Sequence, residues 1–499
     1  MATHHPESLL LALDQGTHST RAQVFSGGGD LLSSSQAGVG INVISEDRVE
    51  QSGPEIAGSC REAATQALAQ AGARPEMVSA AGLACQRSSI ICWDAASGEA
   101  LSPVLSWQDR RHRDLIQELE PHGEEIHRRT GLFLTPHYGA SKLRWCLDNI
   151  PAVARARQGG TLAWGPLASY LVYQLTRERS HLAEPQCASR MQLWSLETRD
   201  WDPWLLELFG LPAEGLPRSV PTICDFGTLS LPGTDSPGIP LRAVNGDQAA
   251  MLFGFGRPRH DTAYVNVGTG AFILRPTPQR APSPRLLSSV VYAGSPEESS
   301  PVLYALEGSV NGAAAALDWL WQQEGAGDQT ARLPGWLEER ENPPLFLNGV
   351  SGLGSPYWRP VFPARFVEDE DADLAGRAVA VVESIAFLIC VNLEEMQRAL
   401  PPPRAITMAG GLSRLDGLCS RLADISGLPV ERVDNPEATC RGLAFLLAGQ
   451  PDNWPEPPRA GRFEPDAASP RALGLKCRYG RWREALEQAL KQALEQGLD

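Results

Sequence analysis

The sequence lacks the cysteine patterns of a structural metal site or of a redox motif. Its ten cysteines are scattered through 499 residues, with no CxxC pair and no cluster with histidine. We therefore expect free, reduced thiols that mostly fill hydrophobic cores, as is typical of a reducing compartment.

Positive charge is also scarce. The chain has 44 Lys and Arg against 59 Asp and Glu, which gives a formal net charge of −15. A surface that neutralises nucleic-acid phosphates or anionic lipids needs the opposite balance. We therefore expect no nucleic-acid partner and no membrane partner, and small molecules become the favoured ligands.

The sequence shows neither a leader peptide nor a long apolar segment. No basic segment and no cleavage site accompany the apolar run at 9–13. Nothing approaches the roughly 20 apolar residues that a membrane span requires. These absences predict a cytoplasmic protein.

The remaining composition is that of an ordinary globular protein. Hydrophobic residues make up 42% and charged residues 21%, which excludes wholesale disorder. The 47 glycines and 40 prolines indicate many tight connections and exclude a coiled coil or a fibre. At roughly 100 to 200 residues per domain, the length predicts two to four domains.

One pattern occurs twice in the sequence. An apolar run of strand length at 9–13 is followed by a turn at 14–20 and a second strand-like run at 21–25. About 250 residues later, the run at 263–267 is followed by Gly268, Thr269 and Gly270 and by another apolar run. One Gly-Thr turn is weak evidence, because many hairpins with such turns bind nothing. Two of them predict two lobes of like construction that face a shared ligand.

The chemistry of these turns suits a polyphosphate. Glycine lets the backbone approach a ligand closely, successive N–H groups converge on an anion, and hydroxyl side chains add donors. A Gly-rich segment at 253–256 separates the two halves. We therefore expect an N-terminal lobe over 1–254 and a C-terminal lobe over 255–499.

The second half alternates between helix and strand patterns. This alternation predicts an α/β lobe. The expected elements are helices at 312–322 and 373–400, a strand at 406–408, a helix at 415–426, a strand at 430–433, a helix at 437–447 and an amphipathic helix at 481–498.

Several motifs together carry a resemblance to a known family. They are LALDQGTHSTRAQVF at 11–25, CQRSSIICWD at 85–94, LSWQDRR at 105–111, NGDQAAMLFGFG at 245–256, VNVGTG at 265–270 and MAGGLSRLDGL at 408–418. In content, order and spacing the chain resembles the FGGY family of carbohydrate kinases, and within it the glycerol-kinase branch. The resemblance implies an α/β, two-lobed, actin-like fold that duplicates a ribonuclease H-like core, with ATP and Mg²⁺ in the inter-lobe cleft. It also implies a small polyol or sugar as substrate, and a homodimer or homotetramer.

Two aspartates are the candidate chemical groups. Phosphoryl transfer to an alcohol needs a carboxylate that accepts the hydroxyl proton, and the family's general base matches Asp247. On the residues alone, Asp247 could equally cap the helix that follows it. The resemblance places Asp14 and Asp247 at the Mg²⁺–phosphate assembly, although Asp14 could also shape its turn.

The resemblance assigns two groups of residues to the nucleotide. Three of these residues depart from the family pattern. Ala314 replaces a usual glycine, and Leu415 replaces a usual asparagine. His18 replaces a usual small hydroxyl residue. The expected nucleotide residues are Thr17, His18, Ser19 and Arg21 in the first half, and Gly268, Thr269, Ala314, Gly410, Gly411 and Leu415 in the second.

The acceptor site matches the family in part. Arg87, Trp107, Asp247 and Gln248 match the family's acceptor positions, whereas Ser88 stands where glycerol kinases have Glu, and His137 where they have Tyr. Losing the carboxylate removes a charge-assisted hydrogen bond of about 1.5 to 3 kcal/mol unless something replaces it. Arg87 could alternatively be a structural ion-pair residue, and Trp107 a core aromatic.

Three functions remain open at this stage. The leading one is ATP-dependent phosphorylation of a small polyol or sugar, with glycerol as the favoured acceptor. A catalytically weak, ligand-sensing regulator on the same fold is the second, although it gives no reason to retain both aspartates and both turns. An actin-like or chaperone-like ATPase is the third, and it would hydrolyse ATP without any polyol.

Overall fold

The computed structural model describes residues 8–232, 238–295, 302–340, 342–368, 372–434 and 437–495. The chain forms two compact units. Unit 1 comprises Met1–Pro258, Ser289–Tyr304 and Glu437–Glu456, and unit 2 comprises Arg259–Ser288, Ala305–Pro436 and Pro457–Asp499. The domain division at 254 and 255, which was expected from the Gly-rich segment at 253–256, stays a prediction.

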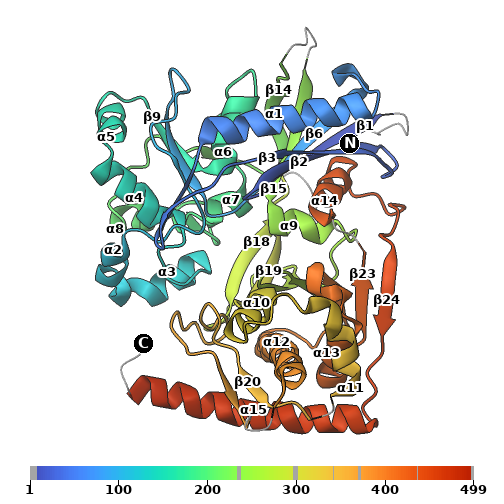
Figure 1. The fold of residues 1–499 in the computed structure, drawn as a ribbon. Helices are drawn as coiled ribbons and strands as arrows, with labels where there is room; N and C mark the ends of the chain where they lie inside the picture. Colours follow the sequence, from blue (N-terminus) through green and yellow to red (C-terminus); the bar gives the residue numbers. More distant parts are fainter. Residues whose placement is uncertain are drawn as a thin grey trace. The chain divides into compact units, whose positions relative to one another are not determined.

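Unit 1 is built on a six-stranded mixed sheet (Figure 1). Strand β1 runs antiparallel to β2 and parallel to β6, and β6 runs parallel to β15. Helix α1 packs on β2 and β3, and α14 packs on β1 and β6. The order of the sheet is β14 (Ile223–Leu229), β15 (Ile239–Gly246), β6 (Val78–Cys85), β1 (Leu9–Gln15), β2 (Ser19–Ser26) and β3 (Leu31–Gly38).

The other elements of unit 1 surround a five-stranded sheet and two strand pairs. The five-stranded sheet contains β4 (Asn42–Ser45), β5 (Arg48–Gln51), β8 (Val104–Leu105), β7 (Ile90–Asp94) and β9 (Leu162–Pro166). The strand pairs are β10 (Leu182–Ala183) with β13 (Arg218–Ser219) and β11 (Trp194–Ser195) with β12 (Asp200–Trp201). The helices are α1 (Gly53–Gln70), α2 (Arg113–Glu118), α3 (Gly123–Thr130), α4 (Gly139–Asn149), α5 (Pro151–Gln158), α6 (Leu167–Leu175), α7 (Pro185–Ser189), α8 (Pro203–Leu208), α9 (Asp247–Phe253) and α14 (Ala438–Leu447).

Unit 2 repeats the strand pairing of unit 1. Strand β16 runs antiparallel to β17 and parallel to β22, as β1 does to β2 and β6. The seven-stranded sheet that contains β16 has the order β18 (Leu287–Tyr292), β19 (Leu303–Val310), β17 (Ala271–Thr277), β16 (Thr262–Val267), β22 (Ala405–Ala409), β23 (Val430–Val433) and β24 (Arg459–Phe463). The internal repeat expected from the two Gly-Thr turns is therefore confirmed, and each unit is an α/β structure.

The helices of unit 2 follow the sequence-based expectations closely. They are α10 (Ala314–Gln323), α11 (Leu333–Glu339), α12 (Leu374–Met396), α13 (Asp416–Ser426) and α15 (Pro470–Glu495), beside the short strand pair β20 (Leu345–Leu347) and β21 (Arg365–Val367). Helix α15 begins at Pro470 rather than at residue 481. Its first turns include Gly474, a weak helix former, but Ala472 and Leu475 are buried in the core of unit 2. Residues 496–498 of the expected helix lie outside the described residues.

Helix α12 corrects one expectation. It has 23 residues and a mean hydropathy of 2.0 in its most apolar window, so length and composition alone would let it cross a membrane. In the structure 89% of that window is buried, and α12 is the core helix of unit 2. Packing on all sides explains why this helix is apolar around its whole circumference.

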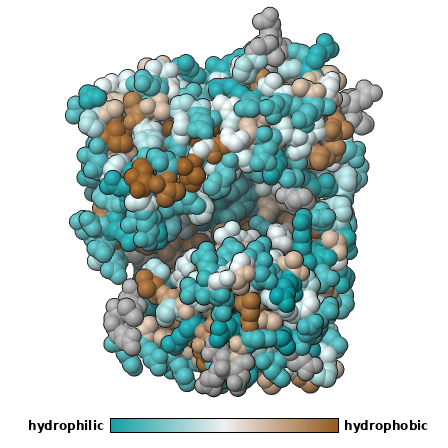
Figure 2. Space-filling model, in the orientation of Figure 1, coloured by the Kyte–Doolittle hydropathy of each residue, from teal (hydrophilic) through white to brown (hydrophobic). Residues whose placement is uncertain are grey.

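The surface and the cysteines agree with the composition. On the face shown in Figure 2, hydrophilic residues predominate and hydrophobic residues form smaller groups. All ten cysteines are free, and eight of them are buried. The expectation of free thiols that fill cores is confirmed.

Candidate active site

Asp247 is the first residue of α9, directly after β15. Gly246 makes the junction, and a Cβ there would lie 1.9 Å from the Gln186 Oε1 atom, so a larger residue would displace the side chain of Gln186. The Asp247 Oδ1 atom accepts a 2.7 Å hydrogen bond from the Gln248 N–H. The same oxygen lies 3.6 Å from Arg87 Nε. The N-cap of α9 is Gly246, and Asp247 is its first helical residue and makes no side-chain cap bond, so the capping interpretation is wrong. The carboxylate of Asp247 instead faces a cationic side chain.

Asp14 lies near the end of β1 and is electrostatically linked to Asp247. Burial, and then the Asp247 charge, raise the pKa of the Asp14 carboxyl to about 7, and Arg21 opposes this rise. The Glu437 charge also raises the pKa of Asp14. A carboxyl whose pKa is raised by burial and by neighbouring carboxylates is a place where a bound cation lowers the electrostatic energy.

The first Gly-Thr turn lies beside these carboxylates in unit 1. A backbone hydrogen bond of 2.9 Å from Gly16 N–H to the Ser19 carbonyl closes the turn. Thr17 and Ser19 are half-buried and His18 is exposed. Thr17 and His18 lie in the connection from β1 to β2, and Ser19 is already the first residue of β2, so the turn is shorter than the expected 14–20.

Arg21 follows the turn on β2 and is paired. Its Nη1 atom lies 2.6 Å from Glu437 Oε2, just before α14, and its Nη2 atom donates 3.2 Å to Gln36 Oε1. Sequence reasoning placed Glu437 only at a helix start. No signal in the sequence pointed to this pair, because its partners are separated by most of the chain.

A ring of hydrogen bonds connects the first turn to Trp107. The Trp107 indole Nε1–H donates 2.9 Å to Thr17 Oγ1, and its backbone N–H donates 2.9 Å to Ser89 Oγ. Ser89 Oγ donates 3.0 Å to Gln86 Oε1. Gln86 Nε2 donates 3.1 Å to Gln51 Oε1, and Gln51 Nε2 donates 2.8 Å to the Thr17 carbonyl. The indole is 40% exposed, so the interpretation of Trp107 as a core aromatic is wrong.

Two of the predicted acceptor residues, Arg87 and Gln248, lie beside Asp247. Arg87 donates from Nη2 to Gln248 Oε1, in addition to its approach to Asp247. Ser88, the next residue, has a left-handed backbone with φ of 63°. The loop after β6 therefore turns sharply between Arg87 and the buried Ser89.

His137 has a defined tautomer. Its Nδ1 atom lies 3.3 Å from the Trp107 carbonyl, and a carbonyl can only accept, so Nδ1 carries the proton. Burial lowers the pKa of His137 to about 4, which keeps the imidazole neutral near pH 7. Its Nε2 atom is then a hydrogen-bond acceptor, the capacity that a Tyr or Glu oxygen would otherwise supply.

In unit 2 the structure brings most of the predicted nucleotide residues together. The Gly268 N–H donates 2.8 Å to the Gly270 carbonyl, and the Ala314 N–H at the start of α10 donates 3.0 Å to the Gly268 carbonyl. Thr269 is exposed at the tip of this turn. Gly410 has φ of 94°, and a Cβ there would lie 2.5 Å from the Val267 carbonyl oxygen. Gly410 therefore packs closely against the end of β16, just before the second Gly-Thr turn.

The other two predicted residues lie further along the chain. Gly411 is exposed and starts a short 3₁₀ helix, η4 (Gly411–Arg414). Leu415 is only 7% exposed, and its side chain belongs to the hydrophobic core of unit 2. The structure therefore gives the Leu415 side chain a packing role, and its contact with a nucleotide stays a prediction.

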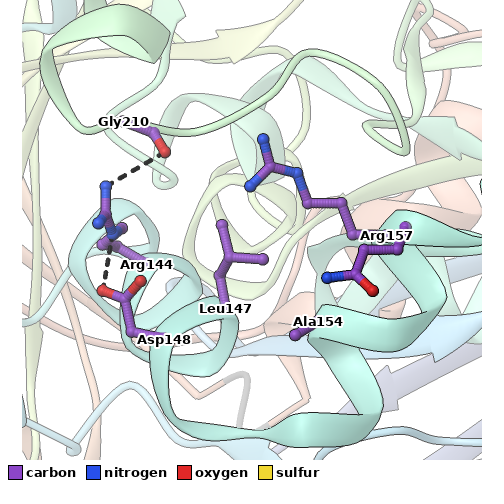
Figure 3. Close-up of a pocket in the computed structure, with 7 residues that line it drawn as sticks. Arg144, Leu147, Asp148, Ala154, Arg157 and Gly210 are labelled. Carbon is purple, nitrogen blue, oxygen red and sulfur yellow. Dashed lines mark hydrogen bonds and ion pairs between the residues drawn. The ribbon is translucent and has the colours of Figure 1, made fainter.

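A surface pocket in unit 1 is lined by other residues (Figure 3). It has a volume of about 350 Å³ and lies between α4 and α5. Arg144 donates 2.7 Å to Asp148 and 3.3 Å to the Gly210 carbonyl, and Arg157 extends over the same hollow. None of the predicted site residues lines this pocket.

Comparison with known proteins decides the family. Residues 9–254 match the N-terminal domain, and residues 263–449 the C-terminal domain, of the FGGY family of carbohydrate kinases. The chain belongs to this family. It is therefore a phosphotransferase that uses an alcohol group as acceptor, and family membership implies ATP as the phosphoryl donor.

Relatives and solved structures agree with this assignment. The chain is 34% identical to glycerol kinase 1 of Pseudomonas aeruginosa over 444 residues, which cover 88% of this chain and 89% of the relative. It is 33% identical to a glycerol kinase of Thermus brockianus over 497 residues, 96% of this chain and 98% of the relative. The crystal structure of Plasmodium falciparum glycerol kinase with ADP is similar in fold, with a TM-score of 0.87, 22% identity and coverage of 97% and 98%. A xylulose kinase structure from Rhodospirillum rubrum reaches 0.85 with 19% identity, over 96% and 98%.

Proposed function

We propose that this carbohydrate kinase transfers the γ-phosphoryl group of ATP to a hydroxyl of glycerol. The observation that carries the proposal is the position of Asp247, at the start of α9 and beside Arg87, in a chain about one-third identical to glycerol kinases along most of its length. A ligand-sensing regulator without turnover is not favoured, because it would need no general base at Asp247 and no Arg87 beside it.

Asp247 is the proposed general base. As the acceptor oxygen forms its bond to the γ-phosphorus, the bond from that phosphorus to the ADP oxygen breaks, and the hydroxyl proton passes to the Asp247 carboxylate. The hydrogen bond from Gln248 N–H and the nearby Arg87 guanidinium hold the carboxylate in one orientation. Fixing the base in this way lowers the entropic part of the barrier.

Mg²⁺ is proposed to bind at Asp14 and Asp247. Among the described residues no group of three or more His, Cys, Asp or Glu could form an all-protein metal cage. Mg²⁺ keeps several waters and takes few protein oxygens in kinases, so one or two carboxylates suffice. The raised pKa of Asp14 beside Asp247 fits this role, because a cation would relieve the repulsion between the two groups. When bound, the ion would neutralise phosphate charge.

Recognition of the acceptor is assigned to Arg87, Trp107, His137 and Gln248. The exposed indole of Trp107 offers an apolar face to a carbon chain, and the neutral His137 offers the acceptor Nε2. Ser88 supplies a hydroxyl in place of a carboxylate. This donor and acceptor set suits a small polyol, and another polyol or ketose remains the alternative acceptor.

The nucleotide is assigned to both Gly-Thr turns. The residues proposed to bind the phosphates are Thr17, His18, Ser19 and Arg21 of unit 1 and Gly268 and Thr269 of unit 2. The residues proposed to lie near the nucleoside are Gly410 and Gly411. Ala314 and Leu415 are also proposed to lie near the nucleoside. The cleft between two lobes, where this family is expected to bind ATP, stays part of the proposal.

The decisive experiment is an ADP-release assay with Mg²⁺ and a panel of acceptors. The panel contains glycerol, dihydroxyacetone, erythritol, ribitol, xylulose, ribulose and a blank without acceptor. We expect glycerol to give the highest kcat/KM and the blank to be nearly silent. Release without acceptor at the same rate would indicate an ATPase, and the absence of turnover with every acceptor would contradict the proposal.

The role of Asp247 is tested by Asp247→Asn. Loss of the base is expected to lower kcat by about 100-fold or more, while ATP binding and the unfolding temperature stay near those of the wild type. Asp225→Asn is the matched control, since Asp225 is exposed and pairs with Arg242 on the neighbouring strand. Near-normal turnover by Asp247→Asn would show that another group takes the proton.

Two further properties are proposed from the family resemblance. We expect a homodimer or a homotetramer, which sedimentation equilibrium would distinguish. We also expect a cytoplasmic location, which ten free thiols suit because a reducing compartment keeps them unpaired.

A further inference from the structure

Lys142 is a buried cation that the proposed chemistry does not use. It lies on α4 with 0% of its surface exposed. Its Nζ atom donates 2.7 Å to the Ser106 carbonyl and 3.1 Å to the Ser88 carbonyl. These carbonyls lie in two separate loops, one after β6 and the other after β8. One ammonium group therefore joins two segments that are distant in sequence.

The two segments are those that carry the predicted acceptor residues. Ser106 directly precedes Trp107, and Ser88 directly follows Arg87. A second link runs from Trp107 N–H to Ser89 Oγ at 2.9 Å. The loops are thus tied at two points, the Ser88 carbonyl and the Ser89 hydroxyl, and the backbone of Ser88 is left-handed. Two ties fix the spacing of the indole and the guanidinium more firmly than one.

The charge of Lys142 is not balanced by an ion pair. In the described parts of the chain no carboxylate forms an ion pair with its ammonium, and the nearby Asp109 carboxylate is held by Arg111 at 2.6 Å and by the Val49 N–H at 2.9 Å. Burial lowers the pKa of Lys142 to about 7, while Asp109 opposes and Arg111 adds to that shift. A neutral amine still has two N–H donors, one for each carbonyl. The tie therefore persists whether or not the group is charged.

Lysine is rare in this chain. Only three of the 44 Lys and Arg in the chain are lysines, and the other two, Lys476 and Lys491, are exposed on α15. The chain thus uses arginine almost wherever a cation is needed. A guanidinium can bridge two carbonyls, as Arg275 does for those of His260 and Pro401, but it is larger than an ammonium and presents its donors in a fixed fork. We therefore expect arginine at position 142 to change the spacing of the two carbonyls.

We propose that Lys142 is the positioning residue of the acceptor site, holding the Arg87 and Trp107 loops at the spacing that a small polyol requires. This inference rests on the proposed function, because it concerns the same acceptor. Lys142 acts through the backbone of these loops and touches neither substrate.

The kinetic test compares Lys142→Met, Lys142→Arg and the control Lys476→Met. We expect both Lys142 variants to raise the KM for glycerol by about 10- to 100-fold, with the KM for ATP within about threefold of the wild type, because displacement of the acceptor loops affects one substrate selectively. The Lys476→Met control should match the wild type. A Lys142→Arg variant with normal glycerol kinetics would overturn the argument from shape. Equal changes in both KM values, or only a lower unfolding temperature, would show a general structural role.

A second measurement does not depend on turnover. Hydrogen–deuterium exchange of peptides that cover 86–90 and 105–109 should accelerate in Lys142→Met, while peptides of β1 and β2 keep the wild-type rate. Should Lys142→Met not fold, Lys142→Gln, which keeps a neutral donor, is measured in the same way. Unchanged exchange in both loops would overturn the positioning role. Wild-type protein that shows this protection but phosphorylates no acceptor would refute the proposed function alone.

Discussion

The indole Nε1 of Trp107 donates a 2.9 Å hydrogen bond to the hydroxyl of Thr17. The bond connects the residue expected to hold the acceptor with the turn expected to hold phosphate, both in unit 1. A second path connects the same two residues through Ser89, Gln86 and Gln51. The positions of the predicted acceptor residue Trp107 and of the predicted phosphate-binding turn at Thr17 are therefore coupled by hydrogen bonds without a ligand.

This coupling can be measured with a double-mutant cycle of Trp107→Phe and Thr17→Val. Each single change removes the same hydrogen bond, so the double variant should lose less free energy of unfolding than the sum of the two. We expect a coupling energy of about 0.5 to 1 kcal/mol, at the low end for a hydrogen bond because the indole is 40% exposed. Chemical denaturation of the four proteins supplies the values. Strict additivity would mean that the bond contributes nothing in solution.

Much of the fold could be predicted from local patterns. The apolar runs at 9–13 and 263–267 predicted β1 and β16, and the Gly-Thr turns after them predicted the repeated hairpins. These features depend on neighbouring residues, which a sequence displays directly. The start of α15 was missed, because its first turns contain weak helix formers and are held by packing on the core.

The sequence predicted those residues of the candidate site that belong to local motifs, but not the contacts between distant segments. Asp247 and Arg87 each lie in a short motif, so their sequence neighbours Gln248 and Ser88 could be expected near them. The pairing of Arg21 with Glu437 and the carbonyls that hold Lys142 depend on segments that are far apart in sequence. Leu415 shows the reverse case, since its motif position suggested a nucleotide contact but its side chain packs in the core.

Acceptor specificity is predicted to respond to Ser88→Glu. A carboxylate beside Arg87 adds a charge-assisted acceptor for a substrate hydroxyl, worth about 1.5 to 3 kcal/mol when formed. We expect kcat/KM for glycerol to rise by about tenfold, with the KM for ATP unchanged, as measured by ADP release. Ser88→Gln, of similar size but neutral, is the matched control. An unchanged kcat/KM would mean that His137 already supplies the acceptor that the carboxylate would add.

A pH-dependent stability is predicted for Glu184, which is buried at the start of α7. It accepts 3.0 Å from the Cys187 N–H and 2.9 Å from the Thr222 hydroxyl, yet burial raises its pKa from 4.5 to about 7. The folded protein therefore keeps the proton at pH values where the unfolded chain has lost it. The contribution of Glu184 to stability is full below about pH 4.5 and is lost as the pH rises through about 7.

Glu184→Gln should consequently be more stable than the wild type at pH 8. We expect a gain of roughly 1 to 3 kcal/mol there and little or no gain at pH 5, because the amide carries no charge to desolvate. Urea unfolding at both pH values measures the difference. Glu62→Gln, on the exposed face of α1, controls for the loss of one negative charge. An equal effect of Glu184→Gln at both pH values would indicate altered packing instead of titration.

The close packing of α14 on α9 yields a prediction that joins stability to catalysis. A Cβ on Gly442 of α14 would lie 1.8 Å from the Ala250 carbonyl oxygen, and backbone cannot move aside as a flexible side chain can. Gly442→Ala should therefore displace α9, whose first residue is Asp247, and destabilise unit 1 by about 1 to 3 kcal/mol. The same displacement should lower kcat, because the proposed base moves with its helix.

The matched control is Gly480→Ala in α15, where an added Cβ meets nothing within 4 Å. Alanine is the better helix former by about 0.8 to 1 kcal/mol, so this variant should be slightly more stable with unchanged kcat. Thermal unfolding and steady-state kinetics of the two variants, measured at one temperature below both transitions, separate the effects. A Gly442→Ala protein that is destabilised yet keeps wild-type kcat would show that Asp247 holds its position independently of the α9–α14 packing.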